Sequence, residues 1–164
     1  IVAYQILGLP NETLDSMIQT LAFNARLPGL LGASPFYRTP NSPITRGMEL
    51  TETDFVKARS TALAIESDGF SRDDIYTLFV TTRIINFLKG LPICESTGLG
   101  KLLTHRRPDP RTQIGFDLLH RLTATGRLYF ATAPGFVENR RFRAGLFARV
   151  LRATGAIKIG RAHV

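Results

Sequence analysis

The chain opens with IVAYQILGLPNET, residues 1–13, in which an apolar run passes directly into a Gly-Leu-Pro turn. Residues 1–7 are apolar on both faces, which predicts a strand of a parallel sheet that is covered on both sides. Thr13 is a candidate N-cap, and Asp15 lies in the first turn, where the helix dipole favours an anion. An amphipathic helix is therefore predicted next. Its apolar positions are Leu14, Met17, Ile18, Leu21, Ala22 and Ala25.

A second strand is predicted after this helix. The run LLGASPFY (residues 30–37) follows a Leu-Pro-Gly break, and the proline-punctuated loop RTPNSP (38–43) ends it. Strand, helix and strand within residues 1–37 have the size of a right-handed crossover unit. Such a unit needs neighbouring strands, so we expect the sheet to continue in another part of a longer polypeptide. Without those neighbours, the first strand should expose apolar surface.

From Thr51 the pattern changes to helices. Thr51 is a candidate helix cap, and Ser71 with Asp74 forms a capping-box-like start. Gly90 and Gly126 are suited to end helices, because glycine readily adopts the left-handed conformation of a C-terminal cap. Helices are predicted at residues 51–65, 71–90 and 112–125 and after residue 138, with a loop at 91–111. The predicted fold class is α/β followed by mainly α.

The composition is that of a globular protein, with 44% hydrophobic and 21% charged residues. No apolar run approaches the roughly 20 residues that a membrane helix needs, so we expect no membrane span. The net charge of +8 fits a solvated basic surface, a docking surface or a site for RNA or another polyanion. A non-catalytic basic binding module is therefore an alternative function, although the scarcity of aromatics beside the arginines gives base stacking little support. Its candidate residues are Arg106, Arg107, Arg111, Arg140, Arg141 and Arg143.

The cysteine count and the two ends of the chain give further expectations. Cys94 is the single cysteine, so an internal disulfide is excluded and a reducing cytoplasm is the expected compartment. The first residue is Ile1 rather than Met, which indicates the middle of a gene. The last residues, KIGRAHV (158–164), resemble the translation of a sequencing-adapter oligonucleotide, so we expect a non-native tail there.

Familiar catalytic and metal-binding patterns are absent from the sequence. It contains no paired cysteines, no His-Glu-x-x-His and no Gly-x-Ser-x-Gly, and residues 98–101 (GLGK) lack the flanking residues of a phosphate-binding loop. His105 and His120 have no supporting carboxylate pattern. The sequence therefore assigns no catalytic residue and no metal ligand.

Residues 4–13 (YQILGLPNET) and 36–43 (FYRTPNSP) together resemble the late part of radical S-adenosylmethionine (radical SAM) barrels. In that family an apolar strand runs into a Gly-Leu-Pro turn and a Glu-Thr pair before a helix. The next strand commonly ends in a Tyr that precedes a loop of the Pro-Gly-Thr-Pro type. Residues 58–62 (ARSTA) and 82–87 (TRIINF) also resemble the tail of a bacterial subgroup. An unrelated α/β crossover unit is the alternative.

The resemblance implies a domain division and a set of cofactor contacts. Residues 1–50 would be the C-terminal portion of a partial (β/α) radical SAM barrel, and 51–157 a helical C-terminal domain. Ile6 would contact the adenine of S-adenosylmethionine, Gly8 would give clearance, and backbone near Phe36 and Tyr37 would flank the base. The cofactor-binding residues predicted in this way are Ile6, Gly8, Leu9, Pro10, Asn11, Phe36 and Tyr37.

The chain departs from the family pattern at two asparagines. Asn11 stands where many relatives have Gly, and the pair at residues 41–42, Asn-Ser, replaces the usual Gly-Thr. Both substitutions are physically reasonable, because asparagine tolerates a left-handed backbone better than most residues.

The implied activity belongs to a larger enzyme. Such an enzyme would reductively cleave S-adenosylmethionine at a [4Fe–4S] cluster and abstract hydrogen from a substrate that the sequence does not identify. The cysteines that bind the cluster would lie in an upstream part of the polypeptide, so this chain alone would be inactive. An upstream cobalamin domain is compatible with the resemblance. The helical part could also serve only as an oligomerisation or docking piece.

Overall fold

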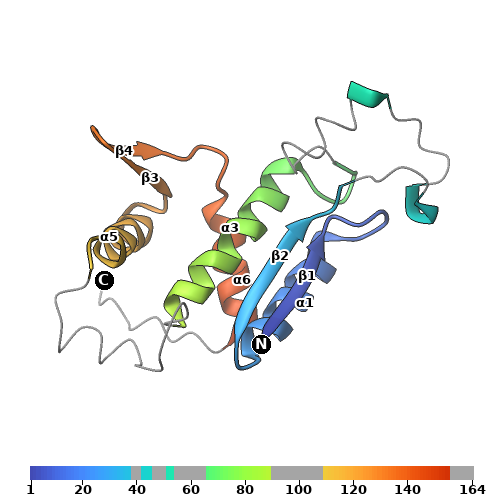
Figure 1. Cartoon of the computed structure of the whole chain (residues 1–164), viewed down its shortest axis with the longest axis horizontal. Helices are drawn as coiled ribbons and strands as arrows, with labels where there is room; N and C mark the ends of the chain where they lie inside the picture. Colours follow the sequence, from blue (N-terminus) through green and yellow to red (C-terminus); the bar gives the residue numbers. More distant parts are fainter. Residues whose placement is uncertain (38–41, 46–50, 54–65, 90–108, 156–164) are drawn as a thin grey trace.

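The computed structural model describes residues 1–37, 42–45, 51–53, 66–89 and 109–155 (Figure 1). This part of the chain is mixed α/β, with four α-helices and two sheets of two strands each. Its elements are β1 (Val2–Leu7), α1 (Leu14–Arg26), β2 (Leu30–Pro35), a 3₁₀ turn (Pro43–Thr45), α3 (Arg72–Leu88), α5 (Pro110–Thr125), β3 (Tyr129–Thr132), β4 (Gly135–Glu138) and α6 (Ala144–Thr154). None of these helices is long and apolar enough to cross a bilayer.

The predicted strand-helix-strand unit is confirmed. β1 and β2 pair in parallel, in a register that places Val2 opposite Leu30 and Leu7 opposite Pro35. The connecting helix α1 begins as predicted, because the Thr13 side chain accepts a hydrogen bond from the Ser16 amide and a reciprocal bond completes a capping box. The second strand is two residues shorter than predicted, since Phe36 and Tyr37 follow its end.

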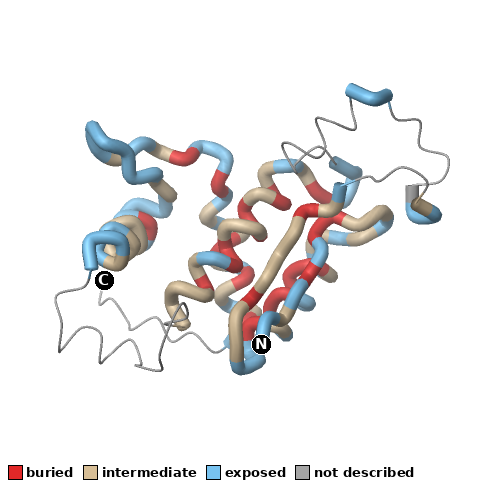
Figure 2. Tube along the Cα trace, in the orientation of Figure 1, coloured by how far each residue is buried: buried red, intermediate tan, exposed pale blue. Residues whose placement is uncertain are grey.

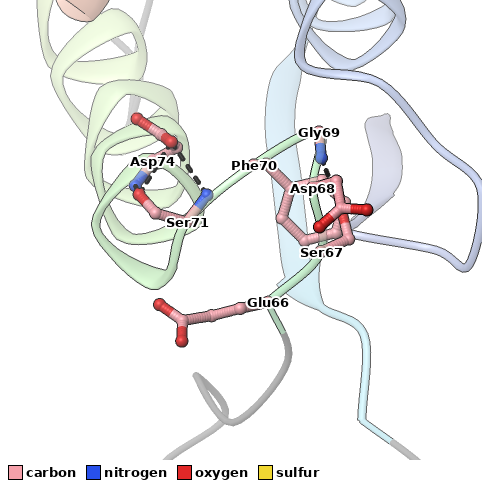
Figure 3. A pocket seen from close by; sticks show the side chains of 7 residues that line it. All are labelled: Glu66, Ser67, Asp68, Gly69, Phe70, Ser71 and Asp74. Carbon is pink, nitrogen blue, oxygen red and sulfur yellow. Dashed lines mark hydrogen bonds between the residues drawn. The ribbon is translucent and has the colours of Figure 1, made fainter.

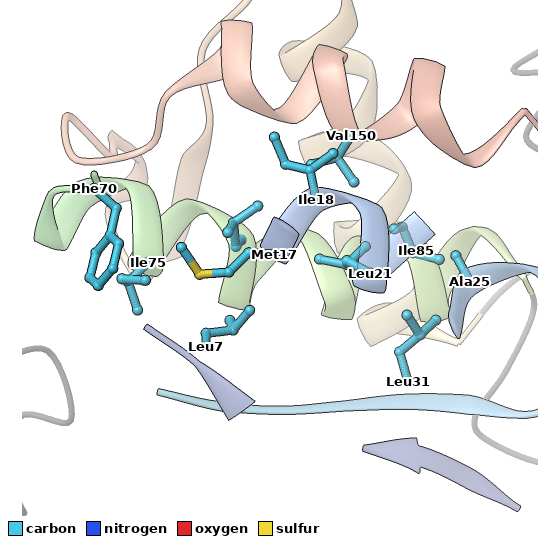
Figure 4. Packing of buried hydrophobic residues seen from close by; sticks show 11 residues of the cluster. Leu7, Met17, Ile18, Leu21, Ala25, Leu31, Phe70, Ile75, Ile85 and Val150 are labelled. Atoms are coloured by element: carbon cyan, nitrogen blue, oxygen red, sulfur yellow. The ribbon is translucent and has the colours of Figure 1, made fainter. Parts of the chain in front are cut away.

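One hydrophobic core joins the sheet to three helices (Figure 4). Helices α1 and α3 pack on the same face of the β1–β2 pair, and α6 packs against α1 and α3. The buried members of this core are Leu7, Met17, Ile18, Leu21, Ala25, Leu31, Phe70, Ile75, Leu78, Ile85 and Val150. Residues on both sides of the predicted boundary at residue 50 therefore contribute to the same core.

The opposite face of the β1–β2 pair has no cover within the described residues (Figure 2). Burial alternates along β1: Gln5 and Leu7 are buried, whereas Val2, Tyr4 and Ile6 are 54%, 65% and 46% exposed. The prediction of a strand covered on both sides is thus wrong for this part of the chain. The expected exposure of apolar surface along the first strand is confirmed.

The outer edge of β2 is partly closed by a side chain. Leu30 and Phe36 donate their amides to carbonyls of the β1 segment, so the intervening Leu31 presents its backbone to the opposite edge. There, Asn86 of α3 accepts from the Leu31 amide and donates to the Leu31 carbonyl, both at 2.8 Å. Pro35 has no amide hydrogen to offer on the same edge. β2 is therefore poorly suited to pair with a further strand.

Asn86→Ala should lower the free energy of unfolding by about 1–3 kcal/mol, because it leaves the amide and carbonyl of Leu31 without their partner. Chemical denaturation followed by circular dichroism measures this change. Gln19→Ala, which removes an exposed amide side chain from α1, is the matched control and should change the value by less than about 0.5 kcal/mol. Equal effects of the two variants would show that the Asn86 contacts add no stability.

The helix ends follow the predicted caps where the structure describes them. Ser71 and Asp74 form the predicted capping box of α3. Helix α5 starts two residues earlier than predicted, because Asp109 caps it. The pKa of Asp109 is lowered, mainly by the hydrogen bond that its carboxylate accepts from the Thr112 side chain. Gly126 ends α5 in the left-handed conformation, as predicted. Thr51 precedes the helical residues Glu52 and Thr53, which agrees with its predicted place at a helix start. Residues 54–65 of that helix, the predicted cap at Gly90 and most of the 91–111 loop lie outside the described residues.

The C-terminal part contains a β-hairpin that the prediction of an all-helical domain misses. Strands β3 and β4 pair antiparallel, with Thr132 opposite Gly135 next to the turn. Helix α6 follows them, as predicted for the residues after Glu138, and starts at Ala144. The hairpin forms where the β-prone residues Tyr129, Phe130, Phe136 and Val137 lie on either side of a Pro-Gly turn.

Candidate cofactor site at the carboxyl ends of the strands

The structure brings the sequence-predicted site residues to one edge of the parallel sheet. Ile6 lies at the end of β1, and residues 8–11 form the turn after it. The amide of Phe36, just beyond β2, donates to the Leu7 carbonyl at 2.7 Å and joins the two strand ends. Tyr37 follows and is exposed. Carboxyl ends of parallel strands are the usual location of ligand sites in α/β proteins.

Gly8 has a different role from the one predicted. Its φ of +81° is a conformation that favours glycine. A Cβ at this position would lie 3.1 Å from Ile75 Cδ1 and 3.3 Å from Phe70 Cε2. The clearance at Gly8 therefore admits core side chains of the α3 region, and not an adenine ring.

The turn after β1 is held by hydrogen bonds of its own. The Glu12 carboxylate accepts from the amides of Gly8 and Leu9 at 2.9 and 3.0 Å. Asn11 has a φ of +65° and is the one non-glycine residue in the described part with a positive φ. The expectation that Asn11 takes up a left-handed backbone in this turn is confirmed; Asn41 lies outside the described residues.

The open face of β1 offers an apolar surface that reaches this edge. Val2, Tyr4 and Ile6 share that face and are all exposed. The Tyr4 ring lies over Gly32 of β2, where a Cβ would overlap the ring atoms. This arrangement provides a flat apolar strip, which ends at Ile6 beside the strand ends.

A polar hollow of about 400 Å³ lies next to the turn (Figure 3). Its lining residues are Glu66, Ser67, Asp68, Gly69, Phe70, Ser71 and Asp74. Asp74 accepts from Ser71 and forms an ion pair with Arg143 at 3.4 Å, and Glu66 pairs with Arg72 at 3.4 Å. Sequence reasoning identified the capping box here but not the hollow, since residues 66–70 carry no recognised motif.

No family model, curated protein or solved structure matches the chain. Within the ranges that the structure describes, no group of His, Cys, Asp and Glu side chains could hold a metal ion.

Four arginines of the alternative polyanion site lie in the described part of the chain. Arg111, Arg140, Arg141 and Arg143 are all exposed, and Arg143 forms an ion pair with Asp74. Arg106 and Arg107 lie outside the described residues. This distribution gives the polyanion alternative no specific support.

Proposed function

We propose that the chain is the C-terminal part of a radical SAM enzyme and contributes the last two strands of its barrel. The family-like motif at residues 4–13 lies at the carboxyl end of β1, and the motif at 36–43 begins at the carboxyl end of β2. The two motifs are thus next to each other at the edge of a parallel sheet where cofactors bind in such folds.

The main support for the proposal is that the two faces of the sheet, and its two edges, differ in what covers them. Helices cover one face, while Tyr4 and Ile6 are exposed on the other, which fits strands whose open face lines the interior of a barrel. Asn86 closes part of the outer edge of β2. The outer edge of β1 has no hydrogen-bond partner within the described residues, so a preceding strand would pair there.

Of the cofactor contacts that the resemblance implies, the geometry of this chain fits the apolar contact to adenine. The half-exposed Ile6 side chain can give apolar contact to the adenine, whereas Gly8 faces the core. With Cys94 as its single cysteine, the chain cannot supply three cluster ligands, which would belong to the upstream part. When bound, the cluster and S-adenosylmethionine supply the radical chemistry. This chain orients the nucleoside and excludes water.

Ile6→Asp should weaken the binding of S-adenosylmethionine to the full-length gene product by about tenfold or more, because it replaces apolar contact with a desolvated charge. Isothermal titration calorimetry measures the affinity. Phe23→Asp places the same charge on a 62% exposed position of α1 and should leave the affinity unchanged. Equal affinities for both variants, or no binding to the unmodified protein, would contradict the proposal.

A further inference from the structure

A second hollow, of about 330 Å³, lies between α3, α5 and the start of β3. Its volume falls in the range of about 300–1,000 Å³ that is usual for small-molecule sites. The lining residues are Tyr76, Val80, Arg83, Ile84, Phe87, Gly115, Leu118, Leu119, Leu128, Tyr129 and Phe130. The α3 residues among them differ from those in the sheet core, so this hollow is separate from the strand ends.

The spacing of α3 and α5 at the hollow depends on a glycine. A Cβ at Gly115 would lie 2.7 Å from the Phe87 ring, so the absence of a side chain lets this ring pack against α5. Phe87 also meets Phe116 edge to face, with ring centroids 5.3 Å apart. These contacts hold the Phe87 ring in the lining of the hollow.

The hollow has few polar groups, and its one charged residue is a cation. Arg83 is the one charged residue in the lining, and its guanidinium carbon lies 4.9 Å from the Phe79 ring centroid. Among the described residues, no carboxylate forms an ion pair with Arg83. The Tyr76 hydroxyl accepts from Asn139 at 2.6 Å. An apolar lining with one unneutralised cation matches a ligand with an apolar body and an anionic end.

We propose that this hollow binds a medium-chain aliphatic carboxylate. The hydrocarbon tail lies among Val80, Ile84 and Leu119, and the carboxylate meets the Arg83 guanidinium. This site is independent of the nucleoside site proposed at the strand ends. An effector and a substrate of the larger protein would be recognised here in the same way, by an apolar tail and one negative charge.

Calorimetric titration of the chain with decanoate and with decanol tests the proposal. Octanoate should bind about tenfold more weakly than decanoate, because two fewer methylenes are buried. Arg83→Gln should weaken decanoate binding about two- to fivefold, as expected for an exposed ion pair, and leave decanol binding unchanged. Leu119→Trp should abolish binding of both probes by filling the hollow. Ile84→Phe is the second filling variant, and circular dichroism confirms that each variant is folded.

Three results would overturn the proposal. They are the absence of decanoate binding, an equal effect of Arg83→Gln on decanoate and decanol, and retained binding in a folded filling variant. S-adenosylmethionine should not displace decanoate, because the two proposed sites are separate. A negative result for decanoate binding would therefore not count against the nucleoside site at the strand ends.

Discussion

Tyr4→Pro is expected to destabilise the full-length gene product by about 1–3 kcal/mol more than Ala33→Pro. The Tyr4 substitution removes an amide from the edge of β1 where a preceding strand would pair. Backbone groups of the even-numbered residues of β1 point away from β2, and in the described residues the Tyr4 amide has no partner. Ala33 lies on the outer edge of β2, next to the edge position that Asn86 occupies. Proline at residue 33 should therefore break no strand pairing.

The same two variants in the 164-residue chain provide the control. Within the described residues neither the Tyr4 amide nor the Ala33 amide pairs with a strand, so the two substitutions should have similar effects on the free energy of unfolding. Denaturant unfolding of each pair measures the difference between the two contexts. A larger effect of Ala33→Pro in the full-length product would show that the sheet extends beyond β2 instead.

Leu21→Ala should lower the free energy of unfolding by about 3–5 kcal/mol, since it creates a cavity in a well-packed core. Leu21 is fully buried in the cluster where α1 packs with α3 and α6. Phe23→Ala, on the exposed side of the same helix, should change the value by less than about 0.5 kcal/mol.

The shared core also predicts a single unfolding transition. Val150 of α6 is fully buried in the same cluster, so Val150→Ala should shift the same transition as Leu21→Ala. Two separate transitions, each sensitive to one of these substitutions, would show that the sheet and the C-terminal helices fold independently.

Local patterns in the sequence predicted the first three elements well. Thr13 and Asp15 marked the start of α1, and its apolar spacing marked the buried face, because caps and helical periodicity are local properties. The hairpin at β3 and β4 was harder to predict, since its strands are four residues each and give too little alternation for a clear period.

The role of Gly8 could not be predicted from local sequence. A glycine after a strand indicates close approach of something to the backbone, but not which group approaches. In this protein Phe70 and Ile75, distant in the sequence, fill that space. The hollow at Arg83 was missed for the same reason, because residues of α3, α5 and β3 form it only after folding.

Formation of 5′-deoxyadenosine tests the central claim most directly. The full-length gene product should be reconstituted with iron and sulfide under anaerobic conditions, reduced, and incubated with S-adenosylmethionine. The proposed function predicts iron–sulfur absorbance and 5′-deoxyadenosine that forms only with reductant. A folded product that shows neither would contradict the assignment of this chain to a radical SAM enzyme.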